Sequence, residues 1–240
     1  MRPLPVVALT FLAACTANPM SRPHRGFLSR EIMVDGVERR YVVYVPREYD
    51  PARIWPLVVF LNGSGECGTD GQKQLLVGIA PAIVNQAKEW PCLVLLAQKP
   101  DRQSAWEHWD AMVMAQLAEV AKEFSIDPKR ISLTGLSQGG HGTWALGARH
   151  KDRWSALAPI CGYGDPAEIA KDLVAIPLWA FHGDADRTVP VQQSKALCDA
   201  VRAAGGTPKL TLYPGVGHNS WDKAYRDEKL AEWLLAQQRP

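Results

Sequence analysis

The stretch Ile131-Ser-Leu-Thr-Gly-Leu-Ser137-Gln-Gly-Gly140 decides the fold of this chain. It places the pattern G-x-S-x-G between an apolar run typical of a strand and a segment with helical periodicity. A serine in this position lies on a sharp turn with strained backbone angles, and Gly135 and Gly139 leave room for that turn. The pattern therefore predicts a nucleophile elbow, with the Ser137 hydroxyl displayed at a helix N-terminus, where negative charge is favoured.

Strand and helix patterns alternate on both sides of this elbow. The run at 56–61 is continuously apolar, which is typical of a strand buried on both faces, and Asp35-Gly36 is a hairpin turn signal. The alternation predicts an α/β fold, a mostly parallel, doubly wound, eight-stranded sheet with helices on both faces that begins with an antiparallel hairpin. Strands are expected at 30–34, 39–45, 56–61, 92–97, 131–135, 156–160, 177–181 and 209–213, and helices at 72–89, 111–124, 139–150, 191–204 and 225–237.

A nucleophilic serine needs a base, and the base needs a carboxylate that orients it. His218 is the best placed base, because it lies in a glycine-rich loop after the last predicted strand. The acid should follow a strand between Ser137 and His218, and both Asp184 and Asp186 do so. Asp186 matches the pattern H-G-x-x-D-x-x-V-P that begins at His182, so Asp186 is the predicted acid and Asp184 the alternative.

The other histidines fit the role of base less well. His141 follows Ser137 too closely to act as the base, and His108 precedes Ser137. Either of these two can line the substrate pocket. His24 and His150 suit ordinary polar or helix-capping roles.

The loop Leu61-Asn-Gly-Ser64-Gly-Glu-Cys-Gly68 follows the first buried strand. A loop in this place usually donates the second N–H group of an oxyanion hole, so the backbone amides of Ser64 and Gln138 are the predicted donors.

From about residue 28 to the C-terminus the chain resembles the α/β-hydrolase superfamily, in particular bacterial esterases grouped with polyhydroxybutyrate depolymerases, feruloyl esterases and the hydrolase domain of prolyl oligopeptidases. The resemblance implies ester hydrolysis by Ser137, His218 and Asp186 through an acyl-enzyme, with no cofactor and no metal. The chain departs from these relatives at two positions, because they usually carry histidine at the place of Asn62 and often arginine at the place of Cys67. The matching segments are Asn62-Gly-Ser-Gly-Glu66, Asp127-Pro-Lys-Arg-Ile131, Ala158-Pro-Ile-Cys-Gly162, His182-Gly-x-x-Asp186-x-x-Val-Pro190 and Gly217-His-x-Ser-Trp221.

The resemblance implies a small-molecule ester substrate. No long insertion resembles a lipase lid, and a compact open site favours a short-chain or aromatic acyl group. Trp106, Trp109 and Trp221 are expected near the rim of the site, where they can form an aromatic wall or simply pack in the core. Two alternative functions stay open. One is a peptidase of prolyl oligopeptidase type, and the other is a catalytically inactive, lipid-anchored binding protein.

The N-terminal segment predicts export. Arg2 precedes a short apolar run at 5–14, and Leu12-Ala-Ala-Cys15 resembles a lipoprotein cleavage site. The expected organisation is a signal peptide at 1–14, a lipidated Cys15 with a tether at 15–27, and a hydrolase domain at 28–240. Thr16 after the cysteine favours the outer membrane, on the periplasmic side. The alternative is an ordinary signal peptide cleaved near Ala17.

Composition narrows the remaining possibilities. The chain has 240 residues, a length typical of one domain, and its 27 basic and 25 acidic residues are interspersed, which argues against a nucleic-acid partner. No cysteine or histidine cluster has zinc-ligand spacing. The sequence does not indicate an oligomeric state. In an oxidising compartment the cysteines after Cys15 allow up to two disulfides, or they are isolated buried thiols: Cys67, Cys92, Cys161 and Cys198.

Overall fold

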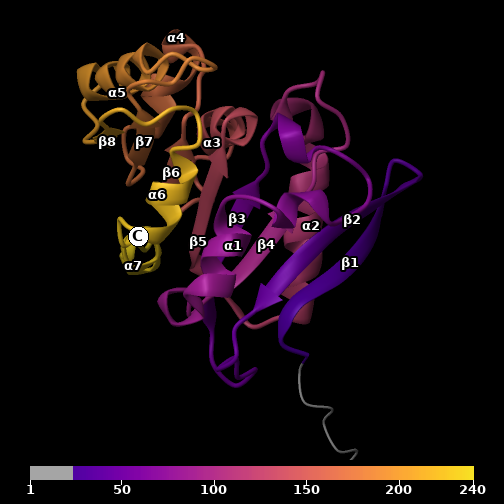
Figure 1. Ribbon diagram of the computed structural model, residues 1–240. Helices are drawn as coiled ribbons and strands as arrows, with labels where there is room; N and C mark the ends of the chain where they lie inside the picture. The colour runs from indigo at the N-terminus through magenta and orange to yellow at the C-terminus, as the bar shows by residue number, and fades with distance from the viewer. Residues whose placement is uncertain (1–23) are drawn as a thin grey trace, which may run out of the picture.

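The computed structural model describes residues 24–240 and contains one eight-stranded α/β sheet (Figure 1). The strand order is β1-β2-β4-β3-β5-β6-β7-β8. The pairs β1–β2 and β2–β4 are antiparallel and all others are parallel, which confirms the predicted fold class. The strands are β1 (Gly26–Val34), β2 (Val37–Val45), β3 (Trp55–Leu61), β4 (Leu93–Ala97), β5 (Ile126–Leu136), β6 (Ala156–Ile160), β7 (Trp179–Gly183) and β8 (Lys209–Tyr213).

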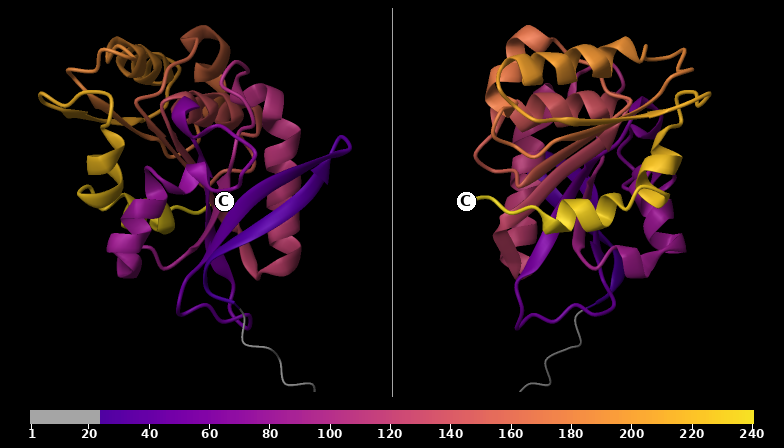
Figure 2. Two further views of the ribbon diagram at one scale, coloured as in Figure 1. Left: turned by 45° about the vertical axis from the view of Figure 1, so that its right-hand side comes forward. Right: turned by 90° about the vertical axis from the view of Figure 1, so that its left-hand side faces the viewer.

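The hairpin of β1 and β2 projects from one edge of the sheet (Figure 2). Its turn has positive φ at both central residues, 50° at Asp35 and 74° at Gly36, as the Asp-Gly signal predicts for a type I′ turn. β1 begins at Gly26, two residues before residue 28, where the hydrolase domain is predicted to begin. The predicted signal peptide and Cys15 lie outside the described residues.

Helices cover both faces of the sheet (Figure 1). Side chains along β3 alternate between two cores: Val58 belongs to the core that includes residues of α1, α6 and α7, whereas Val59 belongs to the core that includes residues of α2, α3 and α5. Parallel strands buried on both faces explain why the run at 56–61 is continuously apolar. The helices are α1 (Ile79–Asn85), α2 (Asp110–Glu123), α3 (Gln138–Arg149), α4 (Pro166–Ile169), α5 (Gln192–Ala203), α6 (Trp221–Arg226) and α7 (Leu230–Ala236).

Two of the predicted helices are wrong in extent. The expected helix at 72–89 is divided into α1 and two short 3₁₀ helices, η2 (Lys73–Leu75) and η3 (Ala87–Glu89). Gly78 has a φ of +73° and interrupts the helical backbone just before Ile79. The expected helix at 225–237 is two helices, α6 and α7, separated by Lys229 in the left-handed region at φ 53°. β7 also begins two residues later than predicted, at Trp179.

Cys67, Cys92, Cys161 and Cys198 are all buried and unpaired, so no disulfide links the described residues. The structure thus supports the alternative of isolated buried thiols. Across 24–240, no helix has the length and apolar character needed to cross a bilayer.

Candidate active site

The nucleophile elbow joins β5 to α3 at Ser137. The backbone of Ser137 has φ 54° and ψ −116°, and its N–H donates to the carbonyl of Ile160 at 2.9 Å. A Cβ atom on Gly139 would lie 2.0 Å from the carbonyl oxygen of Leu61, and one on Gly135 would lie 2.4 Å from the carbonyl oxygen of Gly139. Only glycine fits at these two positions, so the G-x-S-x-G pattern is a steric requirement of the turn.

Three residues that lie far apart in sequence form one hydrogen-bonded chain. His218 Nε2 lies 2.9 Å from Ser137 Oγ, and His218 Nδ1 lies 2.7 Å from Asp186 Oδ2. Ser137, Asp186 and His218 follow the carboxyl ends of β5, β7 and β8, which meet at the same edge of the parallel sheet. The arrangement can carry the Ser137 proton to His218 while Asp186 fixes the imidazole ring.

Asp186 is buried and is held as a carboxylate. Burial acts to raise its pKa, but hydrogen bonds from His218, Val189 and Thr188 outweigh burial and lower the pKa below its usual value. The N–H groups of Thr188 and Val189 donate to Asp186 Oδ1 at 2.8 and 3.0 Å, which leaves Oδ2 for His218. The rival carboxylate, Asp184, is exposed and accepts from Gly215 N at 2.7 Å. It is therefore Asp186, and not Asp184, that contacts the histidine.

His182 lies fully buried beside this turn, where it shapes the loop. Its Nδ1 lies 2.7 Å from Ser194 Oγ, and its Nε2 lies 2.9 Å from Val189 O. Burial lowers the pKa of His182. A neutral imidazole that spans these two partners fixes the backbone from which Asp186 points.

The predicted oxyanion donors lie at two helix starts. Gln138 is the first residue of α3, where N–H groups have no intrahelical partner, and Ser64 is the first residue of the short 3₁₀ helix η1 (Ser64–Glu66). Asn62 and Cys67, the two departures from the family pattern, contact each other: Asn62 Nδ2 lies 3.6 Å from Cys67 Sγ and donates to Gly63 O at 2.6 Å. These contacts tie the loop together without the histidine that relatives usually carry.

The three tryptophans expected at the rim lie in different environments. Trp106 is fully buried and its indole N–H donates to Asn62 O at 3.1 Å, so it is a core residue under the oxyanion loop and cannot line an open pocket. Trp109 is half-buried and donates to Ser104 Oγ at 2.6 Å. Trp221 packs edge-on against the His218 ring at 5.4 Å. Of the three, only Trp221 adjoins the hydrogen-bonded chain.

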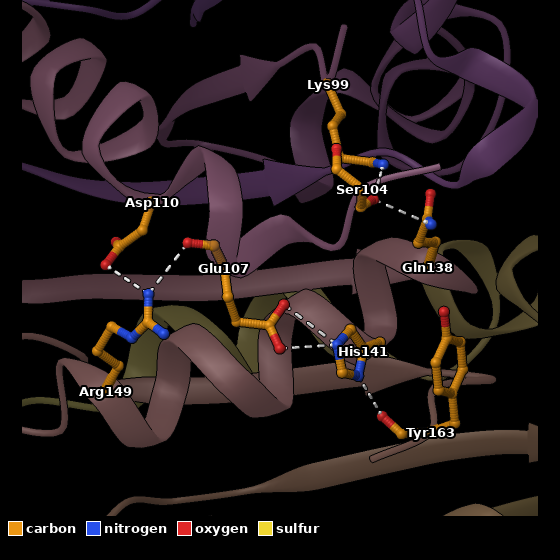
Figure 3. Close-up of polar contacts among 8 residues, drawn as sticks. All are labelled: Lys99, Ser104, Glu107, Asp110, Gln138, His141, Arg149 and Tyr163. Carbon is orange, nitrogen blue, oxygen red and sulfur yellow. Dashed lines mark hydrogen bonds and ion pairs between the residues drawn. The ribbon is translucent and has the colours of Figure 1, made fainter. Parts of the chain in front are cut away.

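A second polar network supports the elbow from the loop after β4 (Figure 3). The Gln138 side chain donates to the carbonyls of Arg102 and Ser104 at 3.1 and 3.4 Å. The buried Lys99 ammonium donates to Asp101 O at 2.5 Å and to Ser104 O, and burial lowers the pKa of Lys99. Sequence reasoning missed Lys99 and Ser104, because no motif marks a side chain that contacts main-chain carbonyls.

Among residues 24–240, one group of His, Cys, Asp and Glu side chains has separations suited to a metal: Cys161, Asp186 and His218, whose ligand atoms lie within 4.8 Å of one another. Asp186 and His218 already bond to each other. Burial raises the pKa of the Cys161 thiol to about 12, which keeps it protonated and a poor ligand. The chemistry of this donor set fits proton transfer better than metal binding.

Solved structures share this fold. A thermostable esterase matches with a TM-score of 0.80 and 33% identity, over 89% of this chain and 63% of that one. A ferulic acid esterase of Anaeromyces mucronatus, solved with ferulic acid, matches with a TM-score of 0.68 over 90% of this chain and 93% of that one. At 14% identity, the second likeness concerns the fold alone.

Comparison with related sequences identifies the family. A protein of Methylorubrum extorquens, named as a carboxymethylenebutenolidase, is 31% identical over 140 residues, which are 51% of this chain and 46% of that protein. The chain thus spans about half the length of this relative. The model of the dienelactone hydrolase family matches residues 81–232, a range that includes Ser137, Asp186 and His218. Since this match covers more than half of the chain, the protein belongs to the dienelactone hydrolase family.

Proposed function

We propose that the protein is a serine esterase that hydrolyses small carboxylic esters through an acyl-enzyme. The observation that carries the proposal is the unbroken chain of hydrogen bonds from Asp186 Oδ2 through both ring nitrogens of His218 to Ser137 Oγ. The same three residue types in this geometry serve nucleophilic catalysis on several unrelated folds. The esterases among the structural neighbours and the family membership support ester hydrolysis.

In the first half of the proposed reaction, Ser137 Oγ attacks the ester carbonyl carbon and its proton passes to His218 Nε2. The backbone amides of Gln138 and Ser64 stabilise the oxyanion, and one such donor contributes about 3 kcal/mol to lowering the barrier. The alcohol then leaves with the proton from His218. In the second half, water attacks the acyl-enzyme, His218 takes a proton from the water and returns it to Ser137 Oγ, and the carboxylic acid is released.

The proposed substrates carry a short-chain or aromatic acyl group. Trp221 beside the catalytic imidazole offers an apolar surface to such a group. A ferulic acid esterase shares this fold, so esters of aromatic acids are included among the substrates to be tested. A peptidase is the second candidate, and turnover of p-nitrophenyl acetate compared with a prolyl peptide amide separates the two. If the protein hydrolyses the amide faster than the ester, a peptidase is the better assignment.

Labelling by a fluorophosphonate probe tests the proposal directly. We expect stoichiometric labelling of the wild-type protein and none of Ser137→Ala. Ser29→Ala is the matched control, because Ser29 is an exposed serine on β1, and it should label like the wild type. If the wild-type protein takes up no probe, the alternative of an inactive binding protein becomes the better description. If Ser137→Ala is labelled like the wild type, Ser137 is not the nucleophile and the proposed mechanism is wrong.

We also propose that the protein is an exported lipoprotein anchored through Cys15, on the periplasmic side of the outer membrane. The support is the segment Leu12-Ala-Ala-Cys15. Mass spectrometry of the mature protein tests this proposal. A mature chain that begins after Cys15, or one with an unmodified Cys15, would contradict it.

A further inference from the structure

His141 lies one helical turn after Ser137, and both of its ring nitrogens face hydrogen-bond acceptors (Figure 3). Nδ1 lies 2.9 Å from the carbonyl oxygen of Tyr163, and Nε2 lies 2.9 and 3.1 Å from the two carboxylate oxygens of Glu107. A neutral imidazole carries one N–H and can satisfy only one of these partners, whereas an imidazolium donates to both. The geometry therefore selects the charged form of His141.

The charged groups around His141 favour the same form. Burial lowers the pKa of His141, but the hydrogen bond and the negative charge of Glu107 outweigh burial, so the pKa lies above its usual value. The Lys99 ammonium opposes this effect. Arg149, further along α3, donates to the Glu107 carbonyl at 3.1 Å and holds that residue from the other side.

Tyr163 is attached to this ion pair and follows a segment that packs on the nucleophile elbow. Its ring stacks on His141 with a centroid separation of 4.7 Å and an angle of 12°. The segment that leads to it packs directly on the elbow: Ser137 N donates to Ile160 O, and a Cβ on Gly140 would lie 2.9 Å from the Cα of Gly162. This close packing fixes the position of Tyr163 relative to Ser137.

The hydroxyl of Tyr163 is available to a ligand. Among the described residues 24–240, its only polar contact runs through its main-chain oxygen, and the half-buried phenol points towards the end of α3 at which Gln138 lies (Figure 3). A half-buried hydroxyl that points towards the first residue of α3, with its ring clamped on one face, is suited to hold a bound molecule in one orientation.

We propose that Tyr163 is a substrate-positioning residue whose hydroxyl binds an oxygen on the aromatic acyl group, and that the His141–Glu107 ion pair holds its ring in place. This inference rests on the proposed esterase function and names the substrate class that the site prefers. The clamp combines two charge-assisted hydrogen bonds with a cation against an aromatic face. It joins η4 (Trp106–Trp109), α3 and the loop after β6 at one point.

Two related esters test the hydroxyl of Tyr163. We expect Tyr163→Phe to raise KM for methyl 4-hydroxycinnamate about fivefold, the effect of one lost hydrogen bond, and to change KM for methyl cinnamate less than twofold. The kcat for both esters should stay near the wild-type value, because the phenol does not take part in the proton transfers. An equal effect on the two esters, or no effect on either, would overturn the role of the hydroxyl.

Variants of the ion pair test the clamp. Glutamine at position 141 donates to one acceptor only, so His141→Gln should raise KM for both cinnamate esters and retain most of kcat. In the wild type the clamp is complete between the lowered pKa of Glu107 and the raised pKa of His141. It is lost as the pH rises through the pKa of His141, so KM should rise at alkaline pH. This rise should be absent in His141→Gln. Glu107→Gln keeps an acceptor but loses the negative charge that raises the pKa of His141, so in this variant the rise in KM should occur at lower pH.

The same helix provides a control for the clamp variants. His150 near its other end bonds to the Asp110 carboxylate at 2.7 Å and makes no ring contact with a tyrosine among the described residues. His150→Gln should leave both KM and its pH profile unchanged. If His150→Gln and His141→Gln behave alike, the effect is a general loss of helix stability and the clamp is refuted.

Fluorophosphonate labelling separates this proposal from the esterase assignment. If the wild type and all variants label at Ser137 and only the KM effects are missing, the Tyr163 proposal fails alone. If the wild type does not label, the proposed esterase function fails first.

Discussion

At the scale of single residues, the site is defined by which carboxylate contacts His218. Asp186 and Asp184 lie two positions apart, yet one is buried against the histidine and the other is exposed against Gly215. The chain turns after β7, where Asp186 N donates to Gly183 O at 3.3 Å, and this turn directs the two side chains to different partners. The difference makes the pair a natural test of the proposed reaction.

Replacing Asp186 by asparagine should lower kcat for p-nitrophenyl acetate by roughly 10⁴-fold, because the amide no longer orients the imidazole in the tautomer that accepts the serine proton. Asp184→Asn has the same change in size and charge and should retain kcat within about twofold. Steady-state kinetics on the two proteins measures both values. A comparable loss in Asp184→Asn would mean that the loop, and not the contact with His218, sets the rate.

Sequence patterns located Ser137, Asp186 and His218 because each lies in a short local motif, and the structure brings the three together. They left Trp106 open between an aromatic wall and core packing, and the structure buries it fully under the oxyanion loop. They also missed Tyr163, whose stacking on His141 depends on how the loop after β6 packs on α3. Burial and contacts of this kind come from tertiary packing, which no local pattern encodes.

At the scale of elements, the turn between β5 and α3 is possible only because Gly135 and Gly139 allow neighbouring backbone segments to approach closely. Gly139→Ala would place a Cβ 2.0 Å from the carbonyl oxygen of Leu61, and backbone cannot move away as a side chain can. We expect a loss of about 3 kcal/mol in the free energy of unfolding, measured by urea denaturation. Gly217→Ala is the control, since nothing lies within 4 Å of its Cβ position and its unfolding should be nearly unchanged. Equal stability of the two variants would contradict the steric argument.

Strands were predictable from sequence to a greater extent than helices. A short, continuously apolar run such as 56–61 is typical of a parallel strand that is covered by helices on both faces. β3 accordingly begins within one residue of its expected start. Helical periodicity continued through Gly78 and Lys229, where positive φ angles break the helices. A lysine in the left-handed region has no sequence signature, because the surrounding packing forces that conformation.

At the scale of the whole molecule, the fold has two cores and no covalent cross-link among its described residues. Reductant should therefore leave the melting temperature of the domain unchanged, because Cys67, Cys92, Cys161 and Cys198 are free. Thermal unfolding with and without a phosphine reductant measures this. A drop in melting temperature on reduction, or faster migration of the unreduced protein in a denaturing gel, would reveal a disulfide and refute the assignment.

The ion pair of His141 and Glu107 also links the stability of the whole domain to pH. The pKa of His141 is raised, so its contribution is fully present below its ordinary pKa and is lost as the pH rises through the folded value. The pKa of Glu107 is lowered, despite the opposing effect of burial, so its contribution is lost as the pH falls through the folded value. Stabilisation by the pair is therefore greatest between these two limits.

His141→Gln should accordingly be less stable than the wild type by about 1 kcal/mol near pH 6, and by much less near pH 9. Urea unfolding of both proteins at the two pH values gives the difference. A penalty of the same size at both pH values would mean that the ring contributes by packing on Tyr163 rather than by its charge. The ion pair and the contact with Tyr163 join α3 to η4 and to the loop after β6. A penalty that depends on pH would therefore mean that the proton on His141 both stabilises the domain and holds Tyr163 in position.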